Sequence, residues 1–277
     1  MSKGGIWTLF AVSSPFDTGN GLVTSPVVSP LILAVIRLTL ALYTLVQFIV
    51  DLALTPSTAT VDPSTHLSAR FSYFTVLSYI GIIAYFWASG VQSAFYVWGR
   101  KTQYPLQQWP RILQFLHMLL YSTITTYPIL VTIVFWALLR DSDTFSTRLN
   151  TWLNISEHAL NTVFALFEIF LTHGGPMPWI HVLFLDLMLA GYLGIAYITH
   201  KTQGFYPYTF LDPKEQGKLL AAYIVGIAVA EILIFIIVRY ACVLRERLSR
   251  RYLTSQPPPA PEAIDEWEEI TPAYMAI

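Results

Sequence analysis

Charged residues are scarce in this chain of 277 residues. Asp, Glu, Lys and Arg make up 12% of it, whereas a soluble globular domain carries about 25%. Hydrophobic residues make up 55%, and the mean hydropathy is +0.53. The formal net charge of −1 gives no basic surface for a nucleic-acid partner. The single cysteine, Cys242, excludes an intramolecular disulfide framework and a cysteine-rich metal site.

Several common motifs are also missing. The sequence has no HExxH, DxxD, GxSxG or P-loop pattern. These absences argue against the usual metal, prenyl-transfer, serine-hydrolase and nucleotide sites, so we predict no metal and no cofactor. Internal repeats of the kind that build many transporters are not evident. The apolar run Ile6–Val12 is too short for a convincing signal peptide, so we expect the first spanning helix to act as an uncleaved targeting signal.

Long apolar runs dominate what remains, and a run of about 20 residues suffices to cross a bilayer. We therefore predict an all-α integral membrane protein with about six transmembrane helices. The six runs are Leu31–Leu54, Phe71–Trp98, Ile112–Leu139, Leu153–Thr172, Trp179–Thr199 and Leu219–Leu244.

The runs divide the chain into three parts. Residues 1–30 are predicted to be an N-terminal cytoplasmic segment, and residues 31–244 a six-helix transmembrane domain. Residues 245–277 read as a basic, then acidic and proline-rich tail, which has nothing with which to bury a core and is expected to be disordered.

The positive charges predict an orientation. Four arginines lie between positions 245 and 251, and the second connection holds Arg100, Lys101 and Arg111. Because cytoplasmic loops are enriched in Lys and Arg, we expect this connection and both termini to face the cytoplasm. The expected location is the endoplasmic reticulum or the plasma membrane.

The second run carries a stripe of polar residues. Ser72, Thr75, Ser78 and Tyr79 are three and four positions apart, the spacing of one helix face. A single threonine in a membrane helix usually bonds to its own backbone, but the stripe indicates a face turned toward a cavity.

The fourth run contains a histidine between two amides. Asn154, His158 and Asn161 fall on one face of a regular helix. An intramembrane histidine is a functional hypothesis by default, although a hydrogen-bonded cluster between helices remains an equal alternative. Thr75 and His158 each lie about one and a half turns inside helices expected to start on the same side. A hydroxyl, a base and amide donors at similar depth are the parts of a nucleophilic site.

Other ionisable residues fall into two groups. Arg37 is expected to pair with Glu168 or Asp186, and we favour a structural ion pair over a proton relay. His200 begins an aromatic loop. That loop is either an interfacial belt or a cover over the cavity, with His200 in the cavity wall.

These residues resemble those of a known family. The likeness is clearest at Trp152–His158, at Glu168, and at His200 with Gly204–Pro207, while Thr75 follows Phe74 early in the second helix. In these features the chain resembles the androgen-induced and androgen-dependent TFPI-regulating proteins, which are multi-pass threonine hydrolases.

The resemblance implies a function. It makes Thr75 the nucleophile and His158 the base of an intramembrane hydrolase acting on fatty acid esters of hydroxy fatty acids, with the lipid ester entering from the bilayer. Ser72, Ser78, Tyr79, Asn154, Asn161, Glu168 and His200 are then candidates for substrate-binding or supporting roles. The alternatives are a small multi-pass transporter, a lipid-binding or signalling scaffold, or an inactive family member.

Overall fold

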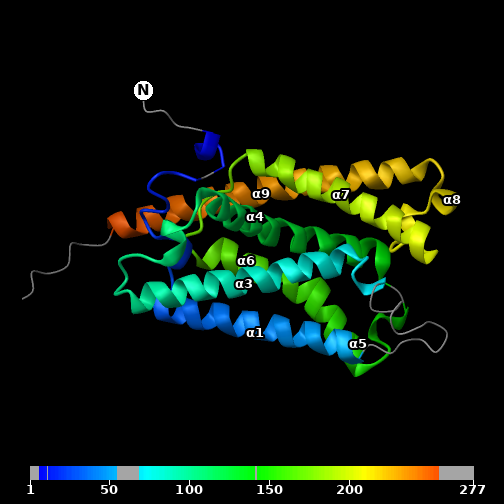
Figure 1. The fold of residues 1–277 in the computed structure, drawn as a ribbon, viewed down its shortest axis with the longest axis horizontal. Coiled ribbons are helices and arrows are strands. Elements are labelled where there is room, and N and C mark those ends of the chain that lie inside the picture. Colours follow the sequence, from blue (N-terminus) through cyan, green and yellow to red (C-terminus); the bar gives the residue numbers. More distant parts are fainter. Residues whose placement is uncertain (1–5, 11, 55–68, 141, 256–277) are drawn as a thin grey trace, which may run out of the picture.

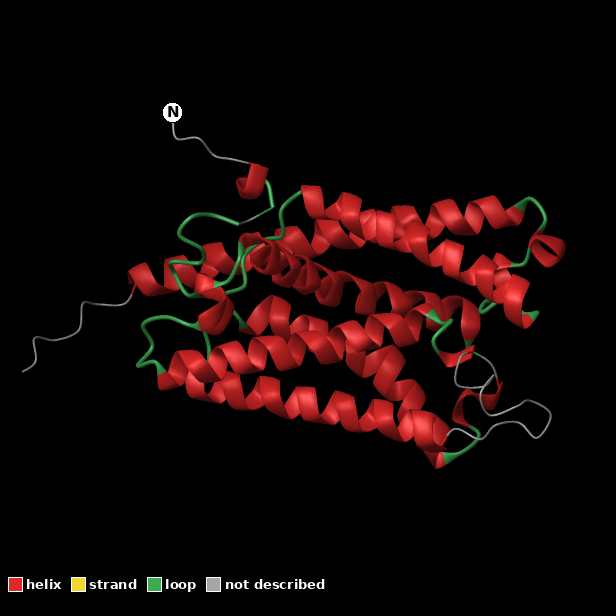
Figure 2. Ribbon diagram, in the orientation of Figure 1, coloured by secondary structure: helices red, strands yellow, loops and turns green. Residues whose placement is uncertain are grey.

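The computed structural model describes residues 6–10, 12–54, 69–140 and 142–255, and its described part contains helices but no strand (Figures 1 and 2). This confirms the all-α prediction. The helices are α1 (Pro30–Leu54), α3 (Phe74–Trp98), α4 (Arg111–Val134), α5 (Arg148–Ile155), α6 (Asn161–Leu171), α7 (Ile180–Gln203), α8 (Pro213–Gln216) and α9 (Leu219–Ser255).

Five of these helices are long and apolar enough to cross a membrane: α1, α3, α4 with its C-terminal π-helical turn, α7 and α9. The fourth predicted run is split, because the π-helical turn Ser156–Leu160 separates α5 from α6. Together these three pieces form one helical path along the bundle. The path makes a sixth passage, so α1 begins and α9 ends at the same end of the bundle (Figure 1). The chain is an integral multi-pass membrane protein, and which end faces the cytoplasm stays a prediction.

The second helix begins three residues later than predicted, at Phe74 rather than Phe71. The preceding turn is held from outside. The carbonyl of Ser72 accepts a hydrogen bond from the Tyr192 hydroxyl at 3.0 Å, and its side-chain oxygen accepts one from Thr199 at 2.9 Å. The first bond occupies a backbone carbonyl that could otherwise accept a helical hydrogen bond. The next residue, Tyr73, has an extended backbone. The later start places Thr75 in the first turn.

The last helix runs further than predicted. α9 continues past Leu244 through the arginine-rich stretch to Ser255. The sequence has no helix breaker until Pro257, and a helix usually ends at or before the residue preceding a proline. The prediction of disorder for residues 245–277 is therefore wrong for residues 245–255, which are helical. Residues from 256 on lie outside the described part of the chain.

Helix α4 contains an internal proline, Pro128. The hydroxyls of Thr123, Thr125 and Thr126 all bond to backbone carbonyls one turn earlier. On the next helix, Asn161 and Thr162 donate to the carbonyl of Pro128 at 3.3 and 3.0 Å. Side chains thus add hydrogen bonds to backbone carbonyls before the proline and to the carbonyl of the proline itself.

A buried ion pair joins three helices. Arg37 on α1 donates to both carboxylate oxygens of Glu168 on α6, at 2.8 and 2.7 Å. The same guanidinium donates to Ser93 of α3, and the Tyr85 hydroxyl donates to Glu168. Both charged residues are at most 1% exposed. The predicted ion pair is confirmed, with Glu168 as the partner rather than Asp186; its structural role stays a prediction.

The N-terminal segment folds over one end of the bundle. Val12, Phe16 and Val23 are buried in a small apolar cluster with Tyr104 and Leu106 of the connection between α3 and α4. The carbonyl of Leu22, in this segment, accepts a hydrogen bond from Arg37. The segment therefore belongs to the packed structure, at the end opposite Thr75.

The ion pair predicts a stability defect. Glu168→Gln leaves the Arg37 charge buried without its counter-charge, which typically costs about 3–5 kcal/mol. We expect a clearly lower unfolding temperature for the detergent-solubilised variant, measured by intrinsic fluorescence. Glu215→Gln, at an exposed position of α8, is the matched control. Equal unfolding temperatures for the two variants would contradict a structural role for the pair.

Candidate functional site

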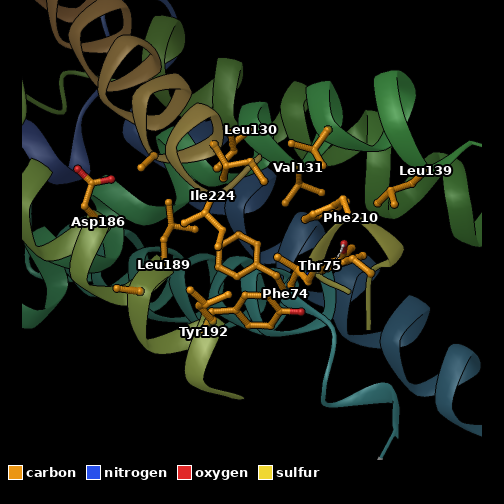
Figure 3. A pocket seen from close by; sticks show the side chains of 17 residues that line it. Phe74, Thr75, Leu130, Val131, Leu139, Asp186, Leu189, Tyr192, Phe210 and Ile224 are labelled. Atoms are coloured by element: carbon orange, nitrogen blue, oxygen red, sulfur yellow. Dashed lines mark hydrogen bonds between the residues drawn. The ribbon is translucent and has the colours of Figure 1, made fainter. Parts of the chain in front are cut away.

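An elongated apolar cavity of about 180 Å³ lies between α3, α4, α7 and α9 and is covered by the loop that joins α7 to α9 (Figure 3). Most of its wall is aliphatic or phenylalanine side chain. The polar exceptions are Thr75, Tyr192, Tyr208 and Asp186. Asp186 lies at the opposite end of the cavity from Thr75 (Figure 3). Such a lining suits a hydrocarbon chain with one polar group held near Thr75.

Thr75 is the second residue of α3, so it lies in the first turn rather than one and a half turns inside. The first backbone N–H groups of a helix have no partner within it, and the helix dipole makes this end partly positive. Thr75 is 8% exposed. Its hydroxyl therefore lies beside backbone N–H groups that could stabilise a developing negative charge. Sequence reasoning missed this because it placed the helix start too early.

The covering loop brings a phenol to the threonine. The Tyr208 oxygen lies 3.4 Å from the Thr75 side-chain oxygen and accepts a long hydrogen bond, also 3.4 Å, from the Thr75 backbone N–H. Burial raises the pKa of the Tyr208 phenol, although its hydrogen bonds with Thr75 oppose the change. The phenol is thus neutral at physiological pH, and its O–H is able to donate a hydrogen bond.

Gly204 makes this loop sharp. It ends α7 with φ of 82°, a left-handed conformation that favours glycine. Tyr208 and Phe210 then fold back as stacked rings, with centroids 5.1 Å apart. The aromatic composition of the loop was visible in the sequence, but nothing there singled out Tyr208.

The rest of the predicted polar stripe divides by role. Ser72 anchors the turn before α3, as described above, and Ser78 donates to the Thr75 carbonyl at 2.9 Å. Tyr79 is buried, and its hydroxyl has no hydrogen-bond partner among the described residues. Of the stripe, only Thr75 lines the cavity.

His158 lies in the π-helical turn between α5 and α6. This turn contacts both α3 and α4. The imidazole is 7% exposed and stacks on Phe135 with ring centroids 3.6 Å apart, while the neighbouring Val131 and Val134 line the cavity. No hydrogen bond joins His158 to Thr75 within the described part of the chain, and the His158 Nδ1 atom is buried without a partner.

The two amides do not hold the histidine. Asn154 donates to the carbonyls of Thr144 and Asn150, and Asn161 is bonded to Pro128 and Thr132. The expected common face assumed a regular helix, and the wider π turn breaks that spacing. π turns of this kind often mark functional sites.

Two further candidates lie elsewhere. Glu168 is in the ion pair with Arg37, away from the cavity lining. His200 stacks on Tyr206, with ring centroids 3.9 Å apart, and is not one of the cavity-lining residues. The loop after His200 does cover the cavity, but Tyr208, Phe210 and Leu211 supply the wall. Within the described ranges, no group of three His, Cys, Asp or Glu residues could hold a metal ion.

A family model described as FAR-17a/AIG1-like protein matches residues 31–242. The chain belongs to this family. The match covers all six passages, the Thr75 cavity and the π turn, and it corresponds to the androgen-induced family that the sequence resembles. No curated protein and no solved structure matches the chain.

The cavity predicts binding of an apolar chain in this family member. Ala228 on α9 lines it, so Ala228→Phe should fill part of the space. We expect photo-crosslinking of a diazirine-bearing fatty acid to fall several-fold in membranes with equal expression. Ala222→Phe, on an exposed face of the same helix, should label like the wild type. Equal labelling of both variants would show that the cavity is not the chain-binding site.

Proposed function

We propose that this protein is an intramembrane lipid ester hydrolase with Thr75 as its nucleophile and His158 as its base. One observation carries the proposal: the Thr75 hydroxyl opens on an apolar cavity at the start of a helix, beside the Tyr208 phenol. Membership of the FAR-17a/AIG1-like family supports it. The resemblance to threonine hydrolases suggests fatty acid esters of hydroxy fatty acids as substrates.

The first half of the reaction forms an acyl-enzyme. His158 takes the proton of the Thr75 hydroxyl as the threonine oxygen attacks the ester carbonyl carbon. The carbonyl oxygen becomes an oxyanion, for which the Tyr208 O–H and the Thr75 backbone N–H are the donors. The carbon–oxygen bond to the leaving alcohol then breaks, and His158 returns the proton to that alcohol.

The stacked imidazole must approach Thr75 during this step. Hydrogen bonds of catalytic groups are often long or unaligned before substrate binds and tighten in the complex. The uncommitted ring nitrogen and the contact of the π turn with α3 are compatible with such a movement. Phe135, which stacks on the ring, directly follows Val134 of the cavity wall.

Three substitutions test the assignment. Thr75→Ala and His158→Ala should each abolish hydrolysis, because the weak threonine nucleophile depends on its base. The double variant should be little worse than either single one, and Thr75→Ser should keep part of the activity. The measurement is release of fatty acid from a branched fatty acid ester by membranes with equal expression of each variant.

The control is Thr202→Ala, which removes an exposed hydroxyl bonded to its own helix and should not change activity. Near-wild-type hydrolysis by Thr75→Ala would contradict the assignment of Thr75 as the nucleophile. If the wild type hydrolyses no ester, a transporter or a non-enzymatic lipid-binding scaffold becomes the better reading.

Tyr208 gives a prediction about pH. Tyr208→Phe removes one oxyanion donor, which typically lowers kcat about 10²–10³-fold. Because burial raises the phenol's pKa, the wild-type donor stays protonated through the ordinary tyrosine range, near pH 10. The rate–pH profile should therefore not fall between pH 8 and about 10. A decline there that disappears in Tyr208→Phe would contradict the assignment.

A further inference from the structure

A second group of polar side chains includes His158 and does not line the apolar cavity. We call it the polar cluster, and it consists of Gln47, Asp51, Arg70, Tyr79, Glu157 and His158. Gln47 of α1 donates to Glu157 at 3.0 Å, and Arg70 forms an ion pair with Asp51. Gln47 and Asp51 are four positions apart on α1 and so share one face. Glu157 directly precedes His158 in the π turn, which contacts the helix of Tyr79. The cluster thus joins α1, the start of α3 and the π turn.

The cluster contains buried polar atoms that the protein does not satisfy. Gln47 Oε1, the Tyr79 hydroxyl, Arg70 Nε and His158 Nδ1 have no hydrogen-bond partner among the described residues. Gln47 is fully buried and Tyr79 is 1% exposed. Buried polar groups in folded proteins are almost always hydrogen-bonded, and internal water is the usual partner where several such groups converge.

The cluster also has an outer and an inner end. The Arg70 side chain is 25% exposed, whereas its partner Asp51 is 1% exposed. Arg70 lies just before α3, so it marks the surface end of the cluster. His158 is the inner end, and it belongs to the turn that contacts the Thr75 helix. A line of polar groups therefore leads from the surface of the bundle to the proposed base.

Ester hydrolysis needs a route for water, because its second half, the hydrolysis of the acyl-enzyme, consumes a water molecule. The Thr75 cavity is lined by apolar side chains, and in the acyl-enzyme it would hold the hydrocarbon chain. Water that reached the acyl group through the cavity would have to displace that chain from an apolar surface, which is unfavourable. The buried polar groups of the cluster, in contrast, can hydrogen-bond to water.

We propose that the polar cluster is a hydrated pocket that delivers the hydrolytic water to His158, with Gln47, Tyr79 and Glu157 as its positioning residues. This inference rests on the proposed function. His158 takes a proton from the water as the water oxygen attacks the carbonyl carbon of the acyl-threonine. The bond from that carbon to Thr75 Oγ1 breaks, the threonine oxygen takes the proton from His158, and the free fatty acid leaves.

The test separates formation of the acyl-enzyme from its hydrolysis. Tyr79→Phe removes only a hydroxyl, and Gln47→Leu removes the amide with little change of volume. With a p-nitrophenyl ester of a long-chain fatty acid, each variant should still form the acyl-enzyme. Its steady-state turnover should fall roughly tenfold to a hundredfold. The fraction of protein carrying an acyl group, measured by intact mass spectrometry during turnover, should rise correspondingly.

Two controls exclude a merely structural effect. Tyr121→Phe removes a buried phenol whose partners are Gly174 and Cys242, outside the cluster, and should leave acyl occupancy unchanged. Glu157→Gln keeps a side-chain oxygen that can accept a hydrogen bond, so it should retain more turnover than Glu157→Leu. Unfolding temperatures of all variants are recorded beside the kinetics.

The outcomes are distinct. Slower turnover with higher acyl occupancy supports the water route. Unchanged turnover in Tyr79→Phe and Gln47→Leu overturns it and leaves the proposed function intact. A parallel loss of acylation and turnover also overturns it, since the cluster would then act on folding or on the first step. If the wild type forms no acyl-enzyme, the proposed function and this inference fail together.

Discussion

A polar group inside hydrocarbon needs a partner, and the pair of Arg37 with Glu168 meets this need in the least exposed part of the bundle. One guanidinium satisfies a carboxylate, a serine hydroxyl and a backbone carbonyl, so α1, α3, α6 and the N-terminal segment share a single centre. Because two opposite charges in a low dielectric cannot be separated cheaply, this centre fixes the register of α6 against α1. The π turn, which directly precedes α6, takes its position from it.

The same need explains the contrast at the other end of the bundle. The Thr75 cavity contains few polar groups, and those it has are paired or lie at its two ends. The polar cluster beside it contains several unpaired buried atoms. Thr75 and His158 lie on the two sides of this division. An apolar cavity for acyl chains next to a polar cluster that could bind water would suit the proposed hydrolysis of a lipid ester.

Much of the fold could be predicted from the sequence, because hydropathy and helix length dominate in a membrane. The long helices follow from hydropathy and length. The Arg37–Glu168 pair follows from the cost of burying a charge without a partner. The start of α3 could not be predicted, since it is set by bonds from Tyr192 and Thr199 across more than a hundred residues of chain. The π turn was missed because periodicity arguments assume a regular helix. Both misses fall at the candidate site, where local rules give way to contacts between distant segments.

Thr75 was found as a candidate from the polar stripe and the resemblance, whereas Tyr208 became visible only when the loop was folded over the cavity. Asn154 and Asn161 looked like partners of His158, but the backbone around Thr144, Asn150 and Pro128 engages them instead. Side chains that can satisfy a nearby carbonyl do so first, because an unsatisfied backbone group in the membrane is more costly.

The central claim is that the Thr75 hydroxyl is the nucleophile. Covalent labelling of this residue tests the claim most directly. The wild-type protein in membranes is treated with a fluorophosphonate probe, digested, and searched by mass spectrometry for the modified residue. We predict a phosphonate adduct on Thr75 that is absent in His158→Ala and is blocked by prior incubation with a long-chain ester. A protein that stays unlabelled, or an adduct on another residue with Thr75 unmodified, would contradict it.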